Sequence, residues 1–402
     1  SSSIQGVQKR LENRWVPETC PTCPKTNQVS LGRIKNVVSK KQSHKAKAPR
    51  TKAPRTKAPR TMAPRPKMRD VAELAGVSLQ TVSNFVNDRH DQMNEQTLAK
   101  VSKAMEKLNY RPNVAAASLR SQRTKTIAYL ILDQNSAFLE DPLTSQHLAG
   151  VAEVADRRGY AILVQSGRPN QIDEESLAPL LEGRFDGAII QLSGKPKLRK
   201  KSAEMALSSG LPSVILDEVG LSPGQLGVRA DQEQGAFEIT QHLINLGHVR
   251  IGFIATAAPW AVIEQRYKGF QKAMRHAGIE VVPEHVLLEA VYMAIDGEQL
   301  ALRLLQMKKP PTAFMCTSDL LAAGVMRAVR SLNLEIPRDI AVTGFDNFAF
   351  SQYLQPSLST VKIPVYEMGQ MAANMLIDVI EGIELTKNLV VFRTEIIIRE
   401  SS

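Results

Sequence analysis

The chain has 402 residues, a hydrophobic content of 43% and a formal net charge of +11, which allows two or three domains with sizeable cores. Three cysteines are too few for a disulfide framework in a chain of this length, so we expect a reducing, cytoplasmic environment. No apolar run approaches the roughly 18 residues that span a bilayer, and no signal peptide is evident.

The positive charge is concentrated near the N-terminus. Residues 1–67 carry 17 Lys and Arg against 2 Asp and Glu, residues 68–125 carry 9 against 6, and the remainder carries 25 against 32. A strongly basic segment beside a mildly acidic main body indicates contact with nucleic acid at the N-terminal end.

Residues 1–67 are predicted to form a disordered, basic, Pro-rich arm. The pentapeptide KAPRT occurs three times within residues 47–61, and MAPRP follows. Proline at every fifth position blocks helices and sheet ladders, and the like charges extend the chain. Such an arm either adds affinity for DNA phosphates or is dispensable, as it would be if translation began at Met62 or Met68.

Residues 69–87 predict two short helices joined by a tight turn. Val71, Leu74 and Ala75 recur at helical spacing, and Gly76 then allows the positive φ of a sharp turn. Ser78 is a good N-cap for the next helix. This is the helix-turn-helix pattern, in which the second helix enters the DNA major groove; an ordinary helical hairpin is the alternative.

A third helix is predicted to begin after Asn94 and to end near Asn109. Residues 113–125 follow with an Ala-rich centre that is too short for an isolated helix, so a helix here would need a packing partner. Leu119 beside Arg120 combines an apolar wedge with a guanidinium, which is the chemistry of minor-groove insertion. A plain linker is the alternative.

From residue 126 onward, short apolar runs alternate with amphipathic helical segments. Strands are predicted at 127–132, 160–165, 187–192, 213–217, 250–255, 286–289, 312–316 and 340–345. The alternation predicts parallel sheets with helices on both faces. Because there are too many strands for one small sheet, we expect two doubly wound lobes with a ligand cleft beyond the carboxyl ends of their strands.

Seven segments in order along the chain resemble the lac/purine/galactose repressor family. They are residues 69–87, NYRPN from Asn109 with the Ala-rich segment around Leu119, GHVRIGFI from Gly247, RYKGF from Arg266, PTA from Pro311 leading into Ser318 and Asp319, GFDN from Gly344, and PSLSTV from Pro356. The similarity covers residues 68–402, and the ordered set is highly specific. It implies an operator-binding transcription regulator, a repressor that a small effector controls, and not an enzyme.

The resemblance also implies the domain boundaries. An all-α helix-turn-helix headpiece over 68–112 and a hinge helix and linker over 113–125 would precede an α/β core over 126–402. That core would have two lobes, like the periplasmic sugar-binding proteins, each built on a doubly wound parallel sheet. The first lobe should take about 126–230 and 363–388, and the second about 231–362 and 389–402.

By resemblance, the second helix presents Leu79, Gln80 and Asn84 to the major groove. Gln and Asn can each make two hydrogen bonds to adenine, whereas Leu79 offers only apolar contact, for example to a thymine methyl group. The short polar side chains suited to phosphate oxygens are Ser78, Thr81, Ser83 and Asn87. In the family the hinge becomes helical on DNA, and the residues matching Leu119 and Arg120 enter the minor groove.

The resemblance implies an effector pocket between the lobes. A carboxylate and a guanidinium from opposite lobes suit a hydroxyl-rich ligand, and Asp319 and Arg266 are the candidates. The remaining wall is expected to consist of Tyr292, Asp217, Asp133, Asn135 and Phe138. As alternatives, Arg266 forms a structural ion pair, and Asp133 and Asn135 are solvated loop residues. Asp346 is expected to brace the fold.

The implied partners are operator DNA, a small effector and a second copy of the chain in a homodimer or a tetramer, with no membrane and at the bacterial nucleoid. A sugar is the expected effector, and a nucleoside or nucleobase is the alternative.

No metal and no cofactor are predicted, because Cys20 and Cys23 have no second pair nearby and the histidines are scattered. Neither a Walker motif nor a nucleophile elbow occurs. The rival classes are an enzyme, a two-lobed solute receptor and an architectural DNA-binding protein.

Overall fold

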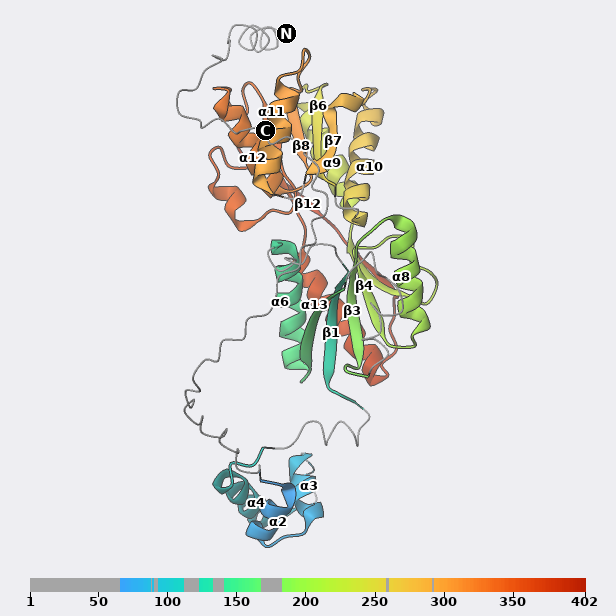
Figure 1. Ribbon diagram of the computed structural model, residues 1–402, viewed down its shortest axis with the longest axis vertical. Coiled ribbons are helices and arrows are strands. Elements are labelled where there is room, and N and C mark those ends of the chain that lie inside the picture. The colour runs from blue at the N-terminus through green and yellow to red at the C-terminus, as the bar shows by residue number, and fades with distance from the viewer. Residues whose placement is uncertain are drawn as a thin grey trace, which may run out of the picture. The chain divides into compact units, whose positions relative to one another are not determined.

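The computed structural model describes residues 66–87, 89, 93–111, 123–132, 141–167, 183–257, 260–290 and 293–402. They belong to two compact units, one within residues 66–111 and the other within residues 123–402 (Figure 1). Residues 1–65 of the N-terminal arm and six predicted site residues lie outside the described residues; these six are Leu119, Arg120, Asp133, Asn135, Phe138 and Tyr292.

The N-terminal unit is a three-helix domain of α2 (Met68–Ala75), α3 (Leu79–Val86) and α4 (Glu95–Lys107). Gly76 ends α2 with a φ of 64°, and the Ser78 side chain accepts a hydrogen bond from the Thr81 N–H at 3.1 Å. Asn94 caps α4 in the same way. These features confirm the predicted turn and both caps. The small core contains Val71, Ala72, Val82, Val101, Ala104 and Tyr110.

The first lobe of the C-terminal unit is a six-stranded parallel sheet in the order β11-β5-β4-β3-β1-β2. Its strands are β1 (Thr126–Leu132), β2 (Ala161–Gly167), β3 (Gly187–Leu192), β4 (Ser213–Leu216), β5 (Leu226–Ala230) and β11 (Leu389–Phe392). Tyr129 packs among residues of α6 (Pro142–Arg157) and α13 (Val365–Glu381), while Leu130 packs on the opposite face with α8 (Pro196–Ser208). Helices therefore cover both faces of the sheet, as predicted (Figure 1).

The second lobe is a four-stranded parallel sheet in the order β7-β6-β8-β9. Its strands are β6 (Ile251–Thr256), β7 (Val286–Ala290), β8 (Ala313–Cys316) and β9 (Ala341–Thr343), and two short 3-10 helices are η4 (Pro283–His285) and η5 (Ala349–Tyr353). Helices α9 (Gln232–Asn245) and α10 (Ala261–His276) cover one face, and α11 (Ala294–Leu305) and α12 (Asp319–Ser331) cover the other (Figure 1).

The chain passes between the lobes three times. It crosses after β5, after β10 (Thr360–Lys362) and after β11, and β10 pairs antiparallel with β12 (Glu395–Ile397). The predicted boundary between the lobes near the C-terminus is wrong. Residues 389–392 were assigned to the second lobe, but they pair with β5 in the first lobe. The physical reason is that the edge of β5 has unpaired backbone groups, which β11 satisfies.

The eight predicted strands correspond to β1, β2, β3, β4, β6, β7, β8 and β9. The prediction missed β5, β10, β11 and β12, which are three to five residues long. The predicted strands β4, β8 and β9 are equally short, but they are almost fully buried, whereas β10, β11 and β12 each carry exposed residues.

Helices α6 and α13 approach each other closely through two glycines. A Cβ atom added at Gly369 would lie 2.2 Å from the His147 carbonyl oxygen, and one added at Gly150 would lie 2.1 Å from the Tyr366 carbonyl oxygen. Both distances are far below van der Waals contact, so only glycine allows this crossing. The crossing also fixes the start of α6, where His147 lies.

We predict that Gly369→Ala lowers the free energy of unfolding by about 1–3 kcal/mol, because the added methyl group forces α13 away from α6. Urea denaturation of the purified protein measures this change. Ala152→Ser, on the exposed side of α6, is the matched control and should leave stability within about 0.5 kcal/mol. Equal stability of both variants would contradict a tightly fixed crossing.

Candidate functional site

One exposed side of α3 carries two linked amide side chains. The Gln80 Nε2 donates a hydrogen bond to the Asn84 Oδ1 at 2.8 Å. Leu79 beside them is 53% exposed, although it is a large apolar side chain. Exposed amides one helical turn apart provide the donors and acceptors that read base edges.

The four predicted phosphate contacts divide into two pairs. Ser78 and Thr81 lie at the N-terminal end of α3, where helix N–H groups favour anionic oxygens. Ser83, in contrast, is only 8% exposed, and the Asn87 side chain donates to the Ser83 carbonyl at 2.6 Å. Ser78 and Thr81 also bond to each other, with 2.8 Å between their hydroxyl oxygens, so the burial of Ser83 is what separates the two pairs.

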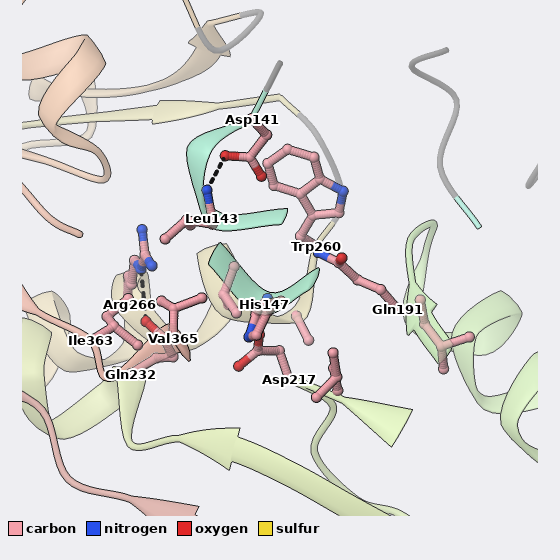
Figure 2. A pocket seen from close by; sticks show the side chains of 14 residues that line it. Asp141, Leu143, His147, Gln191, Asp217, Gln232, Trp260, Arg266, Ile363 and Val365 are labelled. Carbon is pink, nitrogen blue, oxygen red and sulfur yellow. Dashed lines mark hydrogen bonds and ion pairs between the residues drawn. The ribbon is translucent and has the colours of Figure 1, made fainter. Parts of the chain in front are cut away.

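A narrow cleft lies between the two lobes of the C-terminal unit (Figure 2). The ends of β3 and β4 and the start of α6 contribute its first-lobe wall, and the starts of α9 and α10 contribute its second-lobe wall. The lining residues are Asp141, Leu143, His147, Gln191, Leu192, Leu216, Asp217, Gln232, Trp260, Ala261, Val262, Arg266, Ile363 and Val365. The position beyond the carboxyl ends of the strands is the one that the parallel topology predicts.

His147 and Asp217 lie next to each other in the first-lobe wall (Figure 2), with 3.9 Å between His147 Nε2 and Asp217 Oδ2. Among the described residues, neither ring nitrogen of His147 nor the Oδ1 of Asp217 has a hydrogen-bond partner. Burial lowers the pKa of His147 to about 4 and raises the pKa of Asp217 to about 6. At neutral pH the imidazole is therefore uncharged, and the carboxylate is mostly ionised.

Arg266 lines the cleft, but its guanidinium is used within the second lobe. Its Nε donates to Gln232 Oε1 at 3.0 Å, its Nη1 donates to the Thr317 carbonyl, and its Nη2 donates to Asp346 Oδ1 at 3.0 Å. The guanidinium also lies 3.9 Å from the centre of the Phe345 ring. Arg266 thus forms a buried ion pair with Asp346 while it lines the cleft, and its contact with a ligand stays a prediction.

Asp319 does not face Arg266 from the opposite lobe, and the prediction is wrong on this point. Both residues belong to the second lobe, and Asp319 does not line the cleft. Its Oδ1 accepts a hydrogen bond from Thr360 Oγ1 at 2.5 Å, and its Oδ2 accepts from the Phe348 N–H at 2.8 Å and from the Ser351 hydroxyl. Burial raises the pKa of Asp319 to about 6. Its carboxylate ties α12 to η5 and β10.

Sequence reasoning missed five polar or aromatic side chains of the cleft, which are Asp141, His147, Gln191, Gln232 and Trp260. Gln191 lies at the carboxyl end of β3 and Trp260 lies in the loop after β6, so the strand-end rule could have found both. His147 lies in the second turn of α6, and no motif marks it.

A second buried guanidinium joins the two lobes. The Arg199 Nε donates to Glu218 Oε2 at 2.8 Å and its Nη1 donates to the Gly194 carbonyl at 2.7 Å, both within the first lobe. Nη1 and Nη2 also donate to the two carboxylate oxygens of Glu264 on α10, at 3.1 and 3.0 Å. This bidentate pair spans the lobes and favours the closed arrangement.

We predict that Glu264→Ala lowers the free energy of unfolding by about 1 kcal/mol, because it breaks a charge-assisted pair that is partly screened by solvent. Urea denaturation measures the effect. Glu204→Ala is the control, since Glu204 makes only a loose ion pair of 3.9 Å with Lys200 on the exposed side of α8. No difference between the two variants would contradict the inter-lobe bridge.

We predict that His147→Leu gains stability relative to the native protein as the pH falls. Between pH 6.5 and about 4 the unfolded chain protonates this histidine, whereas the folded protein does not. The native protein therefore loses stability as the pH falls through this window, by on the order of 3 kcal/mol, and the Leu variant does not. Urea denaturation of both proteins at several pH values measures the difference. A difference that stays constant from pH 7 to pH 4 would contradict the assignment.

Comparison with known proteins bears on both units. The family model described as "Bacterial regulatory proteins, lacI family" matches residues 67–113, and a periplasmic binding protein-like domain matches residues 240–402. The transcriptional regulator RegA of Clostridium saccharobutylicum is 36% identical over 344 residues, covering 83% of this chain and 98% of RegA. The chain belongs to the lacI family of bacterial regulatory proteins.

Two solved structures extend this similarity to the fold. The lac repressor dimer bound to operator and the anti-inducer ONPF is 26% identical with a TM-score of 0.73, covering 83% of this chain and 98% of that one. The transcriptional regulator CelR in complex with cellobiose is 29% identical with a TM-score of 0.62, covering 84% of this chain and all of that one. The predicted headpiece and two-lobed fold are confirmed. The protein is a lacI-family transcriptional regulator and not an enzyme.

Two further observations concern the described part of the chain. None of its helices combines the length and the apolar character that crossing a membrane requires. Within the same residues, His, Cys, Asp and Glu side chains nowhere group in threes that could hold a metal ion.

Proposed function

We propose that this lacI-family regulator is a repressor that binds a palindromic operator as a homodimer in the cytoplasm, at the nucleoid, and responds to a sugar in the inter-lobe cleft. The observation that carries the proposal is the cleft itself, with unpartnered polar atoms of His147 and Asp217 in its wall. The same chain contains a helix-turn-helix with an exposed pair of amides. A ligand site and a DNA-reading helix in one chain fit a ligand-controlled regulator.

The DNA-binding part of the proposal rests on α3. Gln80 and Asn84 would read adenine edges in the major groove, and exposed Leu79 would contact a thymine methyl group. Ser78 and Thr81 would bind phosphate oxygens at the N-terminal end of α3, with Ser83 and Asn87 as weaker candidates. Leu119 and Arg120 of the hinge stay predicted minor-groove contacts.

The effector part of the proposal rests on the composition of the cleft wall. Asp217 and Gln191 supply acceptors and donors for hydroxyl groups, and Trp260 supplies an apolar ring, whereas the Asp141 carboxylate caps α6. The similar regulator CelR was solved with cellobiose bound, which favours a carbohydrate. A nucleoside is the second candidate, because the Trp260 ring also suits stacking on a base. Asp133, Asn135, Phe138 and Tyr292 stay predicted wall residues, whereas Asp319 is engaged elsewhere.

The experiment for this proposal selects the operator from random duplexes with the purified full-length protein and maps it by DNase protection. A footprint with two-fold symmetry is expected, because each subunit of a dimer reads one half-site. In gel-shift titrations, Gln80→Ala and Asn84→Ala should each lower the affinity for this operator by about 10- to 100-fold. The affinity for unrelated DNA should change little.

Glu106→Ala, on the exposed side of α4, is the control and should bind operator like the native protein. A protection pattern without any sequence preference would contradict the proposal and favour an architectural DNA-binding protein. Equal loss of operator affinity and nonspecific affinity in the α3 variants would show that Gln80 and Asn84 do not read bases.

A further inference from the structure

The two linked amides of α3 differ in their position on the helix and in their exposure. Gln80 is exposed and is the second residue of α3, whereas Asn84 lies one turn further along and is half-buried. The Gln80 Nε2 donates to the Asn84 Oδ1 at 2.8 Å, and among the described residues the Gln80 side chain has no other hydrogen bond. Helix-turn-helix proteins contact base edges with the N-terminal residues of the second helix. Gln80 is therefore the better placed of the two to meet a base.

The bond to Asn84 determines what the Gln80 amide offers to a base. A primary amide has two N–H donors and a carbonyl acceptor, and Asn84 takes one of the two donors. The remaining N–H and the carbonyl oxygen match adenine, which presents the acceptor N7 beside the donor N6–H in the major groove. Guanine presents two acceptors there, so the carbonyl oxygen of the held amide would face an acceptor. A held amide thus selects adenine, whereas a freely rotating amide can also donate to guanine or accept from cytosine.

Holding the Gln80 amide matters most when DNA is bound. A glutamine side chain loses much rotamer freedom when it is ordered, and an exposed amide pair four residues apart on a helix is weak in water. In the groove water is displaced, and linked hydrogen bonds strengthen one another where the dielectric constant is low. The bond to Asn84 therefore acts mainly when a base occupies the other edge of the Gln80 amide.

Building on the proposed function, we infer that Gln80 and Asn84 read a single A·T pair as one unit, in which Gln80 contacts the base and Asn84 is a positioning residue. Two independent readers would each specify a base pair of their own. A single unit specifies one base pair, so the loss of either member removes the same base preference. The partner of this unit is an adenine at one defined position of each operator half-site.

The test measures base preference along the half-site. Purified full-length protein is titrated in gel shifts with the selected operator and with duplexes that carry each of the other three base pairs at each half-site position. The native protein should prefer adenine at one position by about 10- to 100-fold. Gln80→Ala and Asn84→Ala should both abolish the preference at this same position and leave the other positions unchanged. The double variant should bind the operator as tightly as either single variant, because both substitutions remove one shared interaction.

Two variants of similar size separate positioning by Asn84 from direct reading. Asn84→Asp keeps the acceptor oxygen for Gln80, so the adenine preference should persist, although the negative charge weakens binding to all DNA. Asn84→Leu has no acceptor and should lose the adenine preference. Loss of the preference in the Asp variant, or its persistence in the Leu variant, overturns the positioning role.

Gln241 and Asn245 provide the matched control pair. The Gln241 Nε2 donates to the Asn245 Oδ1 at 3.0 Å on α9, with the same spacing but outside the headpiece. Asn245→Ala should leave the operator affinity and every base preference unchanged. If Gln80→Ala and Asn84→Ala instead remove preferences at two different positions, and their losses of affinity add in the double variant, the two residues read bases independently and only the single unit is wrong. If the native protein selects no duplex at all, the proposed function fails.

Discussion

The buried ion pair between Arg266 and Asp346 determines which side of the cleft is available to a ligand. A guanidinium removed from water costs several kcal/mol unless carboxylates and carbonyls surround it. Here Asp346, Gln232 and the Thr317 carbonyl surround it, so that α9, α10 and the ends of β8 and β9 meet at one point. Among the described residues that line the cleft, the buried polar atoms that still lack partners belong to His147 and Asp217 of the first lobe.

The contact between the lobes follows from the same requirement that a buried positive charge be paired with carboxylates. Arg199 is buried in the first lobe, and Glu218 from its own lobe and Glu264 from the second lobe both pair with it. Three chain crossings link the lobes covalently, and this bidentate pair adds a specific contact that depends on closure. A ligand that contacts both walls would favour the same closed arrangement, because it binds best when both walls are close.

Much of the fold could be predicted from local patterns. The run TIAYLIL of β1 is buried on both faces, and the caps Ser78 and Asn94 mark helix starts with side-chain hydrogen bonds to nearby residues. The positive φ of Gly76 likewise depends on its immediate neighbours. Each of these features can be recognised from a few consecutive residues. Together they predict the headpiece and the helix that carries Gln80 and Asn84.

The rest of the site depends on contacts between distant residues. Asp319 meets Thr360 and Ser351, which lie 41 and 32 residues further along the chain, and no local pattern shows that these hydroxyls consume its carboxylate. His147 enters the cleft because two glycines let α6 approach α13. The strand β11 joins the first lobe because the edge of β5 is open to it. The positions of Asp319, His147 and β11 are set by packing between residues that are far apart in the sequence. A comparison of short sequence motifs gives no information on such packing.

The central claim is that ligand binding in the cleft and operator binding by the headpiece are energetically coupled. The most direct measurement is calorimetric titration of the sugar that binds into the full-length protein, once alone and once saturated with its operator duplex. Linkage requires that the operator change the sugar affinity by the same factor as the sugar changes the operator affinity. The account predicts a common factor of about 5- to 150-fold. Identical sugar affinities with and without operator would contradict it.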